Sequence, residues 1–407
     1  MSEPTPQSGD DKTSVLFATI AAGGGHVATA NAMAEELHRL HPGAVSTRVS
    51  DVMAEFGFEK LDKRHKESWR EMLKRPRLVR LGQRLMDAAP GLTRAAQNAL
   101  LNDFAKGAQQ RIDELGPDLV VANHGWLATA LTLARTKYGM RTRVLVFATE
   151  PFDASALWAE PKAEWVVAPS AAAKEDLVRL GVPEPRVAVL GDPVRRAVLE
   201  PPDQPAARAE FGLDDGFTCL LSLGAEGLAG EALQLAESLA RKDVQVVAVA
   251  GRNAELESEL GRLAQRYPRL HAVGFTDRMP AYLAATDLVV GKAGPASTME
   301  ALAVGRPVVA TSYAGLNEER VVRFLQTRGL GGYAPSLATL SAQVDAWQDP
   351  DRRRTAAETA RALDFEGMSG RVAAYISAVA RGVTPPAAVT AERPATSFEA
   401  TTAKSLA

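Results

Sequence analysis

Short apolar runs alternate along this chain with longer segments in which apolar residues recur every three or four positions. The short runs are typical of buried parallel strands, and the longer segments are typical of amphipathic helices. We expect strands at 15–20, 45–51, 118–122, 144–149, 165–168 and 187–190, and then at 217–223, 244–250, 271–275, 288–290 and 308–311. This alternation predicts the α/β class, with parallel sheets covered by helices.

Composition along the chain divides it into parts. Residues 200–205 read EPPDQP, which predicts an interdomain linker because proline stiffens a connection and continues neither a helix nor a sheet. Both ends are polar or rich in Pro, Ala, Thr and Ser, so they cannot offset their ordering entropy. We expect a disordered tail at 1–13, a first Rossmann-like domain at 14–200, a linker at 201–206, a second Rossmann-like domain at 207–362, a helix at 363–382 that packs back on the first domain, and a disordered tail at 383–407.

The overall charge excludes some classes of partner. The 407 residues include 47 Lys and Arg against 49 Asp and Glu, and a chain without a global positive field is not expected to bind nucleic acid. The one cysteine, Cys219, allows neither an internal disulfide nor a cysteine cluster, which fits the cytoplasm. No secretory signal pattern opens the chain and no uncharged apolar run of about 18 residues occurs, so no export and no membrane span are expected.

A glycine-rich loop, AAGGGH, ends at His26 between the first expected strand and a helix. Glycines let the backbone approach a ligand closely, and free N–H groups at a helix start attract negative charge. Gly23, Gly25 and Ala28 match the loose G-x-G-x-x-A pattern of dinucleotide sites. Asp51, at the end of the next strand, would then contact the ribose. The loop could instead be a tight turn whose histidine caps the helix, or it could hold His26 as a general base beside a pocket.

A second turn, GKAGPAST, joins the strand expected at 288–290 to a helix expected to begin near Ser297. The N–H groups and dipole of that helix start, with the hydroxyls of Ser297 and Thr298, could receive a diphosphate. Glu300 lies one turn in, where its carboxylate could accept bonds from ribose hydroxyls. The alternative is a capping box between these hydroxyls and Glu300, which needs no ligand.

This turn, with Arg306-Pro307, GLNEE at 315–319, GRN at 251–253 and the GGGH loop, resembles the monogalactosyldiacylglycerol synthases and processive diacylglycerol glucosyltransferases. These are GT-B enzymes related to the lipid-I N-acetylglucosaminyltransferase, and the resemblance spans residues 14 to 380. It implies two Rossmann-like parallel-sheet domains facing a cleft. It also implies a UDP-sugar as donor substrate, with no cofactor.

The resemblance further implies which residues bind the donor. Near the uracil would lie Phe275, Thr276 and Met279, and Glu300 would hold the ribose. The diphosphate cleft would be lined by Gly224, Ala225 and Glu226. Contacts with sugar hydroxyls would come from Asn317 and Glu318. The expected donor site comprises Phe275, Thr276, Met279, Gly251, Asn253, Glu300, Gly224, Ala225, Glu226, Lys292, Gly294, Pro295, Ser297, Thr298, Asn317 and Glu318.

Two stretches depart from the family pattern. AGLNE at 314–318 replaces the family's P-G-Q-E and is one residue longer, which leaves glucose and galactose as alternative donor sugars. Glu150 stands where the family usually has aspartate before a downstream tryptophan, here Trp158. The longer side chain of Glu150 is expected to alter the acceptor cleft.

The segment 59–85 holds ten Lys and Arg against four acids, interleaved with apolar residues. Such a segment can bury its apolar face at a lipid boundary while its cations meet anionic headgroups. The alternative is a solvated helix pair packed on its own domain, and the resemblance favours membrane and acceptor binding. The acceptor side is expected to comprise Gly24, Gly25, His124, Glu150 and Trp69.

Together these expectations describe a reaction. His26 would take the proton of a diacylglycerol-type hydroxyl as it attacks the anomeric carbon, and UDP would leave with inversion. The remaining histidines lack metal-ligand spacing and no D-x-D signature precedes the donor site, so no metal is expected. The protein would act at the inner face of the cell membrane. The alternatives are a UDP-N-acetylglucosamine 2-epimerase, a transferase with another lipid-linked or small-molecule acceptor, a dinucleotide-dependent oxidoreductase and a noncatalytic binding protein.

Overall fold

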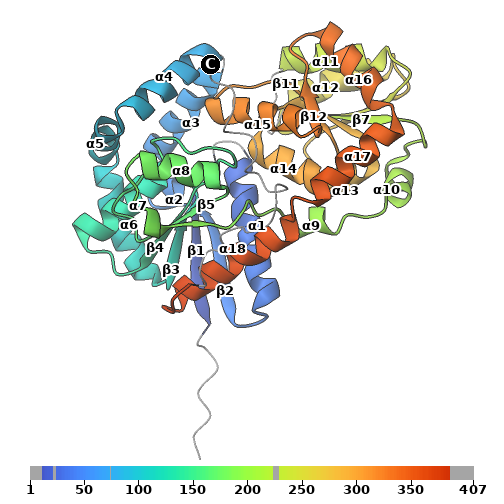
Figure 1. Cartoon of the computed structure of the whole chain (residues 1–407). Coiled ribbons are helices and arrows are strands. Elements are labelled where there is room, and N and C mark those ends of the chain that lie inside the picture. Colours follow the sequence, from blue (N-terminus) through green and yellow to red (C-terminus); the bar gives the residue numbers. More distant parts are fainter. Residues whose placement is uncertain (1–11, 22–23, 74, 223–228, 386–407) are drawn as a thin grey trace, which may run out of the picture.

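Two six-stranded parallel sheets form the framework of the protein (Figure 1). The computed structural model describes residues 12–21, 24–73, 75–222 and 229–385. The first sheet has the order β2-β1-β3-β4-β5-β6, with β1 (Thr13–Thr19), β2 (Val45–Asp51), β3 (Leu119–Ala122), β4 (Arg143–Phe147), β5 (Trp165–Ala168) and β6 (Val187–Val189). The second has the order β12-β11-β10-β7-β8-β9, with β7 (Thr218–Ser222), β8 (Gln245–Val249), β9 (Leu270–Val273), β10 (Leu288–Lys292), β11 (Val308–Ser312) and β12 (Gly331–Tyr333).

Helices connect the strands and cover both sheets, as parallel pairing requires. Those that precede the second sheet are α1 (Gly25–Leu40), α2 (Val52–Glu55), α3 (Glu59–Leu73), α4 (Pro76–Ala88), α5 (Pro90–Leu100), α6 (Asn102–Leu115), α7 (Gly125–Tyr138), α8 (Ala171–Arg179), a 3₁₀ turn (Glu184–Arg186), α9 (Arg196–Leu199) and α10 (Gln204–Phe211). The later ones are α11 (Ala229–Ala240), α12 (Ala254–Ala264), α13 (Met279–Ala285), α14 (Pro295–Ala303), α15 (Leu316–Thr327), α16 (Leu337–Trp347), α17 (Pro350–Arg361) and α18 (Phe365–Ala380).

The α/β class predicted from the apolar runs is confirmed. Each expected strand is present, with ends shifted by at most two residues. The strand β12 was not predicted, because its three residues, Gly-Gly-Tyr, form no apolar run. Among the described residues, no helix has both the length and the apolar character needed to cross a bilayer.

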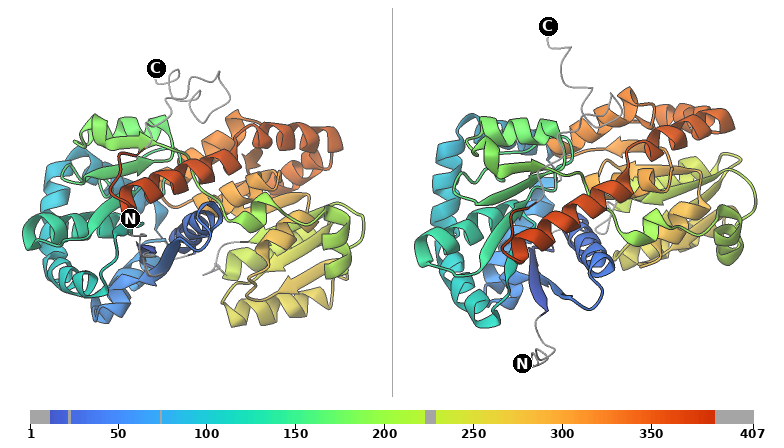
Figure 2. Two further views of the ribbon diagram at one scale, coloured as in Figure 1. Left: turned by 90° about the horizontal axis from the view of Figure 1, so that it is seen from below. Right: turned by 60° about the horizontal axis from the view of Figure 1, so that its bottom comes forward.

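The last helix, α18, returns from the second sheet to the first. Its residues Val372 and Ile376 are fully buried and belong to the same hydrophobic cluster as Val15 and Phe17 of β1. Both views in Figure 2 show α18, in red, lying across the first half of the chain beside α1. The hydrophobic core on this side of the first sheet is therefore completed by the last helix of the chain.

The expected linker and tails need two corrections. Only residues 201–203 of the linker lack regular structure, because α10 begins at Gln204. The Asp203 side chain caps this helix by accepting from the N–H of Ala206 at 3.0 Å, and proline is tolerated in a first helical turn. Thr13, assigned to the first tail, starts β1 and pairs with Val45. The rest of the two tails, 1–11 and 386–407, lies outside the described residues.

A contact between α15 and the loop after β4 joins the two halves of the molecule. The Arg320 Nε atom lies 3.2 Å from an Asp153 carboxylate oxygen, and the rings of Phe152 and Phe324 stack with centroids 4.3 Å apart. This contact holds the carboxyl edges of the two sheets close to each other.

Candidate active site

The carboxyl ends of parallel strands share one edge of their sheet, and ligands bind where the strand order reverses. In the first sheet this point lies between β1 and β3, and in the second it lies between β10 and β7. The loops that follow β1, β3 and β10 lead into α1, α7 and α14. The topology therefore brings the GGGH loop and the GPAST turn to the same region.

His26 lies in the first turn of α1, directly at this region. Its Nδ1 atom is 3.1 Å from the Thr149 hydroxyl oxygen, and its backbone carbonyl accepts from the Asn123 amide nitrogen at 2.5 Å. Burial, and then the charge of His65, lower the pKa of His26 to about 4. The imidazole is therefore neutral near pH 7. If Nδ1 donates its proton to Thr149, Nε2 keeps the lone pair of a general base.

An aromatic cluster surrounds His26. The ring of His124 meets it edge-on with centroids 4.8 Å apart, and the Trp158 indole lies at 6.3 Å. His65 of α3 contacts His124 at 5.3 Å and Trp126 at 4.0 Å. His124 also caps α7, since its Nδ1 accepts from the N–H of Trp126 at 3.1 Å. Burial lowers the pKa of His124 well below its usual range, so this ring is also neutral.

Glu150 lies beside this cluster, in the loop after β4. Its carboxylate accepts from the N–H of Ser155 at 3.1 Å and from the Trp158 side chain. Burial, and then the neighbouring Asp153, raise the pKa of Glu150 to about 8. Burial also raises the pKa of Asp153 to about 7. Trp158 is thus held between Glu150 and His26, and Glu150 carries a proton near neutral pH.

The turn after β10 starts its helix two residues earlier than expected. Gly294 is the N-cap of α14 and Pro295 is its first residue. Ser297 donates to the Gly294 carbonyl at 3.1 Å, and the Thr298 hydroxyl is buried without a hydrogen-bond partner among the described residues. The capping-box alternative is therefore wrong, because the helix has already begun and Glu300 has a different partner.

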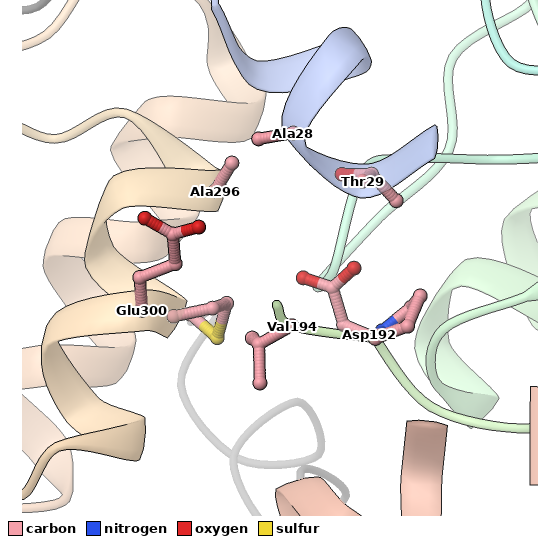
Figure 3. Close-up of a pocket in the computed structure, with 8 residues that line it drawn as sticks. Ala28, Thr29, Asp192, Val194, Ala296 and Glu300 are labelled. Carbon is pink, nitrogen blue, oxygen red and sulfur yellow. The ribbon is translucent and has the colours of Figure 1, made fainter. Parts of the chain in front are cut away.

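That partner is Arg195, from the segment that follows β6. The two guanidinium nitrogens bind the Glu300 carboxylate at 2.5 and 2.7 Å. Asp192 lies across a small pocket from Glu300, as Figure 3 shows. Burial, and then the charge of Glu300, raise the pKa of Asp192 to about 7. Ala28 of α1 faces Ala296 of α14 over this pocket, so the first turns of the two helices meet there.

Glu318 and Asn317 lie in the first turn of α15. The Glu318 carboxylate forms an ion pair with Lys292 at the end of β10, and it accepts from the N–H of Ala314 at 2.7 Å. Asn317 is half-buried beside Gly315. These contacts hold the segment 313–318 against the end of β10; from the role expected of Asn317 and Glu318 it is hereafter called the donor-sugar segment.

The residues expected near the uracil follow β9, and two further residues of the expected donor site, Gly251 and Asn253, follow β8. The Arg252 guanidinium stacks on the ring of Phe275, which is 58% exposed, at 4.4 Å from its centroid. Asn253 caps α12 through Leu256, and Thr276 accepts from the N–H of Arg278 at 3.0 Å. The remaining two are Gly251, at φ 62°, and Met279, the first residue of α13. An exposed aromatic ring beside a cation is suited to stacking with a base.

Other expected site residues are placed as follows. Gly224, Ala225 and Glu226 lie outside the described residues, and Gly23 does too. Gly24 and Gly25 open α1, and a Cβ on Gly25 would lie 3.5 Å from that of Ala296. Trp69 is half-buried in α3, one turn beyond His65. Asp51, the ribose partner of the dinucleotide alternative, is bound instead by Lys66 at 2.6 Å.

The segment 59–85 forms α3 and most of α4. Its residues Leu78, Leu81 and Leu85 are 57%, 53% and 63% exposed. Val79 is buried, so α4 rests on the first domain by one face and presents leucines on another. Within the described residues, no group of three or more His, Cys, Asp or Glu side chains could hold a metal ion.

This geometry has a definite chemical capacity. The first turns of α1 and α14 carry no acidic residue in their described lengths, so the positive ends of two helix dipoles meet at the cleft. A neutral imidazole lies at one of these ends. The arrangement can bind an anion and remove a proton from a hydroxyl next to it.

Comparison with known proteins agrees with this capacity. Residues 222–358 match the glycosyltransferase family 28 C-terminal domain. The UDP-N-acetylglucosamine--N-acetylmuramyl-(pentapeptide) pyrophosphoryl-undecaprenol N-acetylglucosamine transferase of Clavibacter sepedonicus is 31% identical over 330 residues, which cover 77% of this chain and 81% of that enzyme. The chain belongs to glycosyltransferase family 28.

Two further relatives of this glycosyltransferase have names that specify lipid acceptors. Monogalactosyldiacylglycerol synthase 1 of Arabidopsis thaliana is 25% identical over 359 residues, covering 84% of this chain. The match spans only 66% of the length of that synthase. The processive diacylglycerol β-glucosyltransferase of Bacillus licheniformis is 32% identical over 159 residues, or 38% of this chain and 42% of that enzyme.

Solved structures share the fold of this glycosyltransferase. A UDP-N-acetylglucosamine 2-epimerase from Listeria monocytogenes has a TM-score of 0.61 at 15% identity, covering 92% of this chain and 99% of the epimerase. Anabaena HepE, solved with UDP-glucose, has a TM-score of 0.54 at 17% identity, covering 91% and 100%. These likenesses confirm the expected GT-B architecture of two parallel-sheet domains.

Several residues of this region were missed in the sequence. Thr149, Asn123 and His65 contact the His26 environment, and Arg195 binds Glu300. Asn123 could have been found, because it directly follows a strand, as His124 nearly does. No pattern near Arg195 in the sequence indicates Glu300, about a hundred positions away. No pattern near His65 indicates His26, about forty positions away.

We expect Glu150→Gln to change how stability depends on pH. A carboxyl with a raised pKa stabilises the folded state fully below its usual value of 4.5, and this contribution is lost as the pH rises through about 8. Between pH 6 and 9 the variant should therefore lose about 1 to 3 kcal/mol less unfolding free energy than the parent protein. Denaturant unfolding at both pH values measures this. Exposed Glu175→Gln is the control. Equal losses in all three proteins would contradict the raised pKa of the buried Glu150 carboxyl.

Proposed function

We propose that this glycosyltransferase transfers glucose or galactose from a UDP-sugar to a diacylglycerol-type lipid, with inversion, at an anionic membrane surface. The observation that carries the proposal is the meeting of two helix N-termini, where Ala28 of α1 and Glu300 of α14 line one pocket and His26 lies two residues before Ala28. The names of the lipid-specific relatives support the choice of acceptor.

The donor lies along the second domain in this proposal. The uracil stacks near Phe275, the ribose hydroxyls donate to Glu300, and the diphosphate lies at the N-terminus of α14. The bidentate contact with Arg195 orients the Glu300 carboxylate for this role. The sugar then points towards Asn317 and Glu318 of the donor-sugar segment.

The reaction is a single displacement. The lipid hydroxyl oxygen attacks the anomeric carbon, its proton passes to Nε2 of His26, and the bond from that carbon to the diphosphate oxygen breaks. UDP leaves with the bonding electrons. The dipoles and N–H groups of α14 offset the charge that grows on UDP, so the proposed mechanism needs no metal ion. The low pKa of His26 keeps the base neutral before attack.

The acceptor approaches from the first domain. The rings of His124 and Trp158 lie beside His26, and Trp126 continues this aromatic cluster through His65. An aromatic surface of this kind suits a hydroxyl attached to acyl chains. The exposed leucines of α4 and the cations of 59–85 would hold the enzyme on an anionic surface from which such a lipid is drawn.

The deciding experiment measures UDP release from UDP-glucose, UDP-galactose and UDP-N-acetylglucosamine, with and without diacylglycerol in anionic liposomes. We expect release only with lipid, a hexose on the lipid by mass spectrometry, and the same rate with EDTA. Release without a glycolipid product would indicate another acceptor. A donor that isomerises without lipid would identify an epimerase instead.

His26→Ala should lower kcat by a factor of about 10² to 10⁴, because the acceptor proton loses its base. UDP affinity should stay within about twofold, since the imidazole does not bind the nucleotide in this proposal. In the parent enzyme, kcat/KM should fall only as the pH approaches the His26 pKa of about 4. His38→Ala, on the same helix but hydrogen-bonded to Thr47, is the matched control. Full activity of the His26 variant would remove this residue from the mechanism.

Glu300→Gln should weaken UDP binding by about tenfold, because a charged acceptor for two ribose hydroxyls is lost. Isothermal titration calorimetry with UDP measures the change directly and needs no acceptor. Glu358→Gln, exposed on α17, serves as the control. An unchanged dissociation constant would show that Glu300 only anchors Arg195.

A further inference from the structure

Helix α4 presents two faces to its surroundings. Its exposed leucines, Leu78, Leu81 and Leu85, recur at helical spacing on one side. Val79 is buried on the other side, one turn before Gln83. At about 3.6 residues per turn, Gln83 lies on the side opposite Leu81 and Leu85. There it meets the second domain.

Gln83 caps a helix of that second domain. Its Oε1 atom accepts from the N–H of Leu316, the first residue of α15, at 2.8 Å. The N-cap position of α15 is Gly315, which has no side chain to satisfy this N–H group. A Cβ on Gly315 would lie only 3.1 Å from the Gln83 Nε2 atom, so glycine makes room for the amide. A helix cap is thus supplied by a residue 233 positions away.

The capped residue belongs to the donor-sugar segment. Tyr313, at its start, lies under the guanidinium of Arg80, which is 5.3 Å from the ring centroid. Glu318, at its end, is tied to Lys292 and to the N–H of Ala314. Residues 313–318 are therefore held from two sides. Gln83 and Arg80 of α4 contact them from the first domain, and the Lys292–Glu318 ion pair holds them from the second.

Helix α4 also contacts the loop on the expected acceptor side of the site. The Asp87 carboxylate accepts from the N–H of Ala156 at 2.7 Å, within the loop that carries Glu150 and Trp158. One rigid helix thus contacts both halves of the cleft, while its leucines remain exposed. The surrounding segment 59–85 has ten Lys and Arg against four acids. This excess of positive charge favours an anionic lipid surface as the partner that covers the exposed leucines.

We propose that Gln83 is a positioning residue for the donor sugar, and that docking of α4 on an anionic lipid surface tightens UDP-sugar binding through it. The proposal rests on the proposed function for the identity of the donor and of the surface. It concerns the sugar moiety and not the nucleotide, because Gln83 contacts the donor-sugar segment and not the uracil or ribose side. In this proposal the hydrogen bond from the Leu316 N–H to Gln83 couples the lipid surface to the donor site.

The first test titrates variants with UDP-glucose, UDP-galactose and UDP by calorimetry. Gln83→Leu should weaken binding of the preferred UDP-sugar by about fivefold, the usual effect of losing one helix cap, and leave UDP binding unchanged. Gln83→Glu keeps the acceptor oxygen and adds a charge that the start of α15 favours, so its affinity should stay within about twofold of the parent. Gln110→Leu, exposed on α6, is the matched control. Equal loss of UDP and UDP-sugar binding, or no rescue by glutamate, would overturn the positioning role.

The second test adds phosphatidylglycerol vesicles without diacylglycerol, so that no transfer can occur. The parent protein should sediment with the vesicles and bind the UDP-sugar several-fold more tightly than in their absence. Gln83→Leu should sediment equally but show no gain, and the double variant Leu81→Ser, Leu85→Ser should do neither. Vesicle binding by the parent without a gain in affinity would overturn the coupling. A gain in affinity from a protein that never glycosylates a lipid would overturn the proposed function and leave the coupling intact.

Discussion

The close approach of the first turns of α1 and α14 is the contact on which the rest of the site depends. The first turns of α1 and α14 approach closely only because small residues, Gly25, Ala28 and Ala296, stand at their contact. Neither described first turn carries an acid, so the positive potential there is left for a bound anion. This approach also positions His26, because His26 is the second residue of α1.

Because the two halves pack closely, burial also shifts the protonation of titratable side chains between them. Burial moves His26 to its neutral form, and it moves Glu150 and Asp192 towards theirs. Each group would be costly as a charged side chain in this environment. Ionic groups persist at the interface where they have partners, as Arg195 and Glu300 do. The cleft therefore combines neutral titratable groups near the expected acceptor with a paired carboxylate near the expected ribose.

The departure of the donor-sugar segment from the family pattern has a structural counterpart. Gly315 leaves space at the start of α15, and Gln83 of the first domain fills that space. Residues 313–318 are thus held from both domains, by Gln83 and by Lys292. The conformation of this segment therefore depends on the approach of the two domains as well as on its own sequence.

The sequence by itself determined the elements and their class. Apolar runs marked every strand except β12, and the glycine turns correctly marked the starts of α1 and, within two residues, of α14. Such features are local, because strand and helix periodicity and turn chemistry depend on neighbouring residues. The same locality explains the error at Ser297: the residues there resemble a capping box, but the helix begins at Pro295 and Gly294 is its N-cap.

Only the tertiary structure decided which side chains meet. Glu300 binds Arg195 from 105 positions away, Leu316 is capped by Gln83, and α18 returns to complete the first core. These pairings follow from the order of strands in the sheets and from the approach of two domains, which no local spacing encodes. The shifted protonation of His26 and Glu150 has the same origin, because desolvation depends on all the chain segments that surround a group and not on its neighbours in sequence.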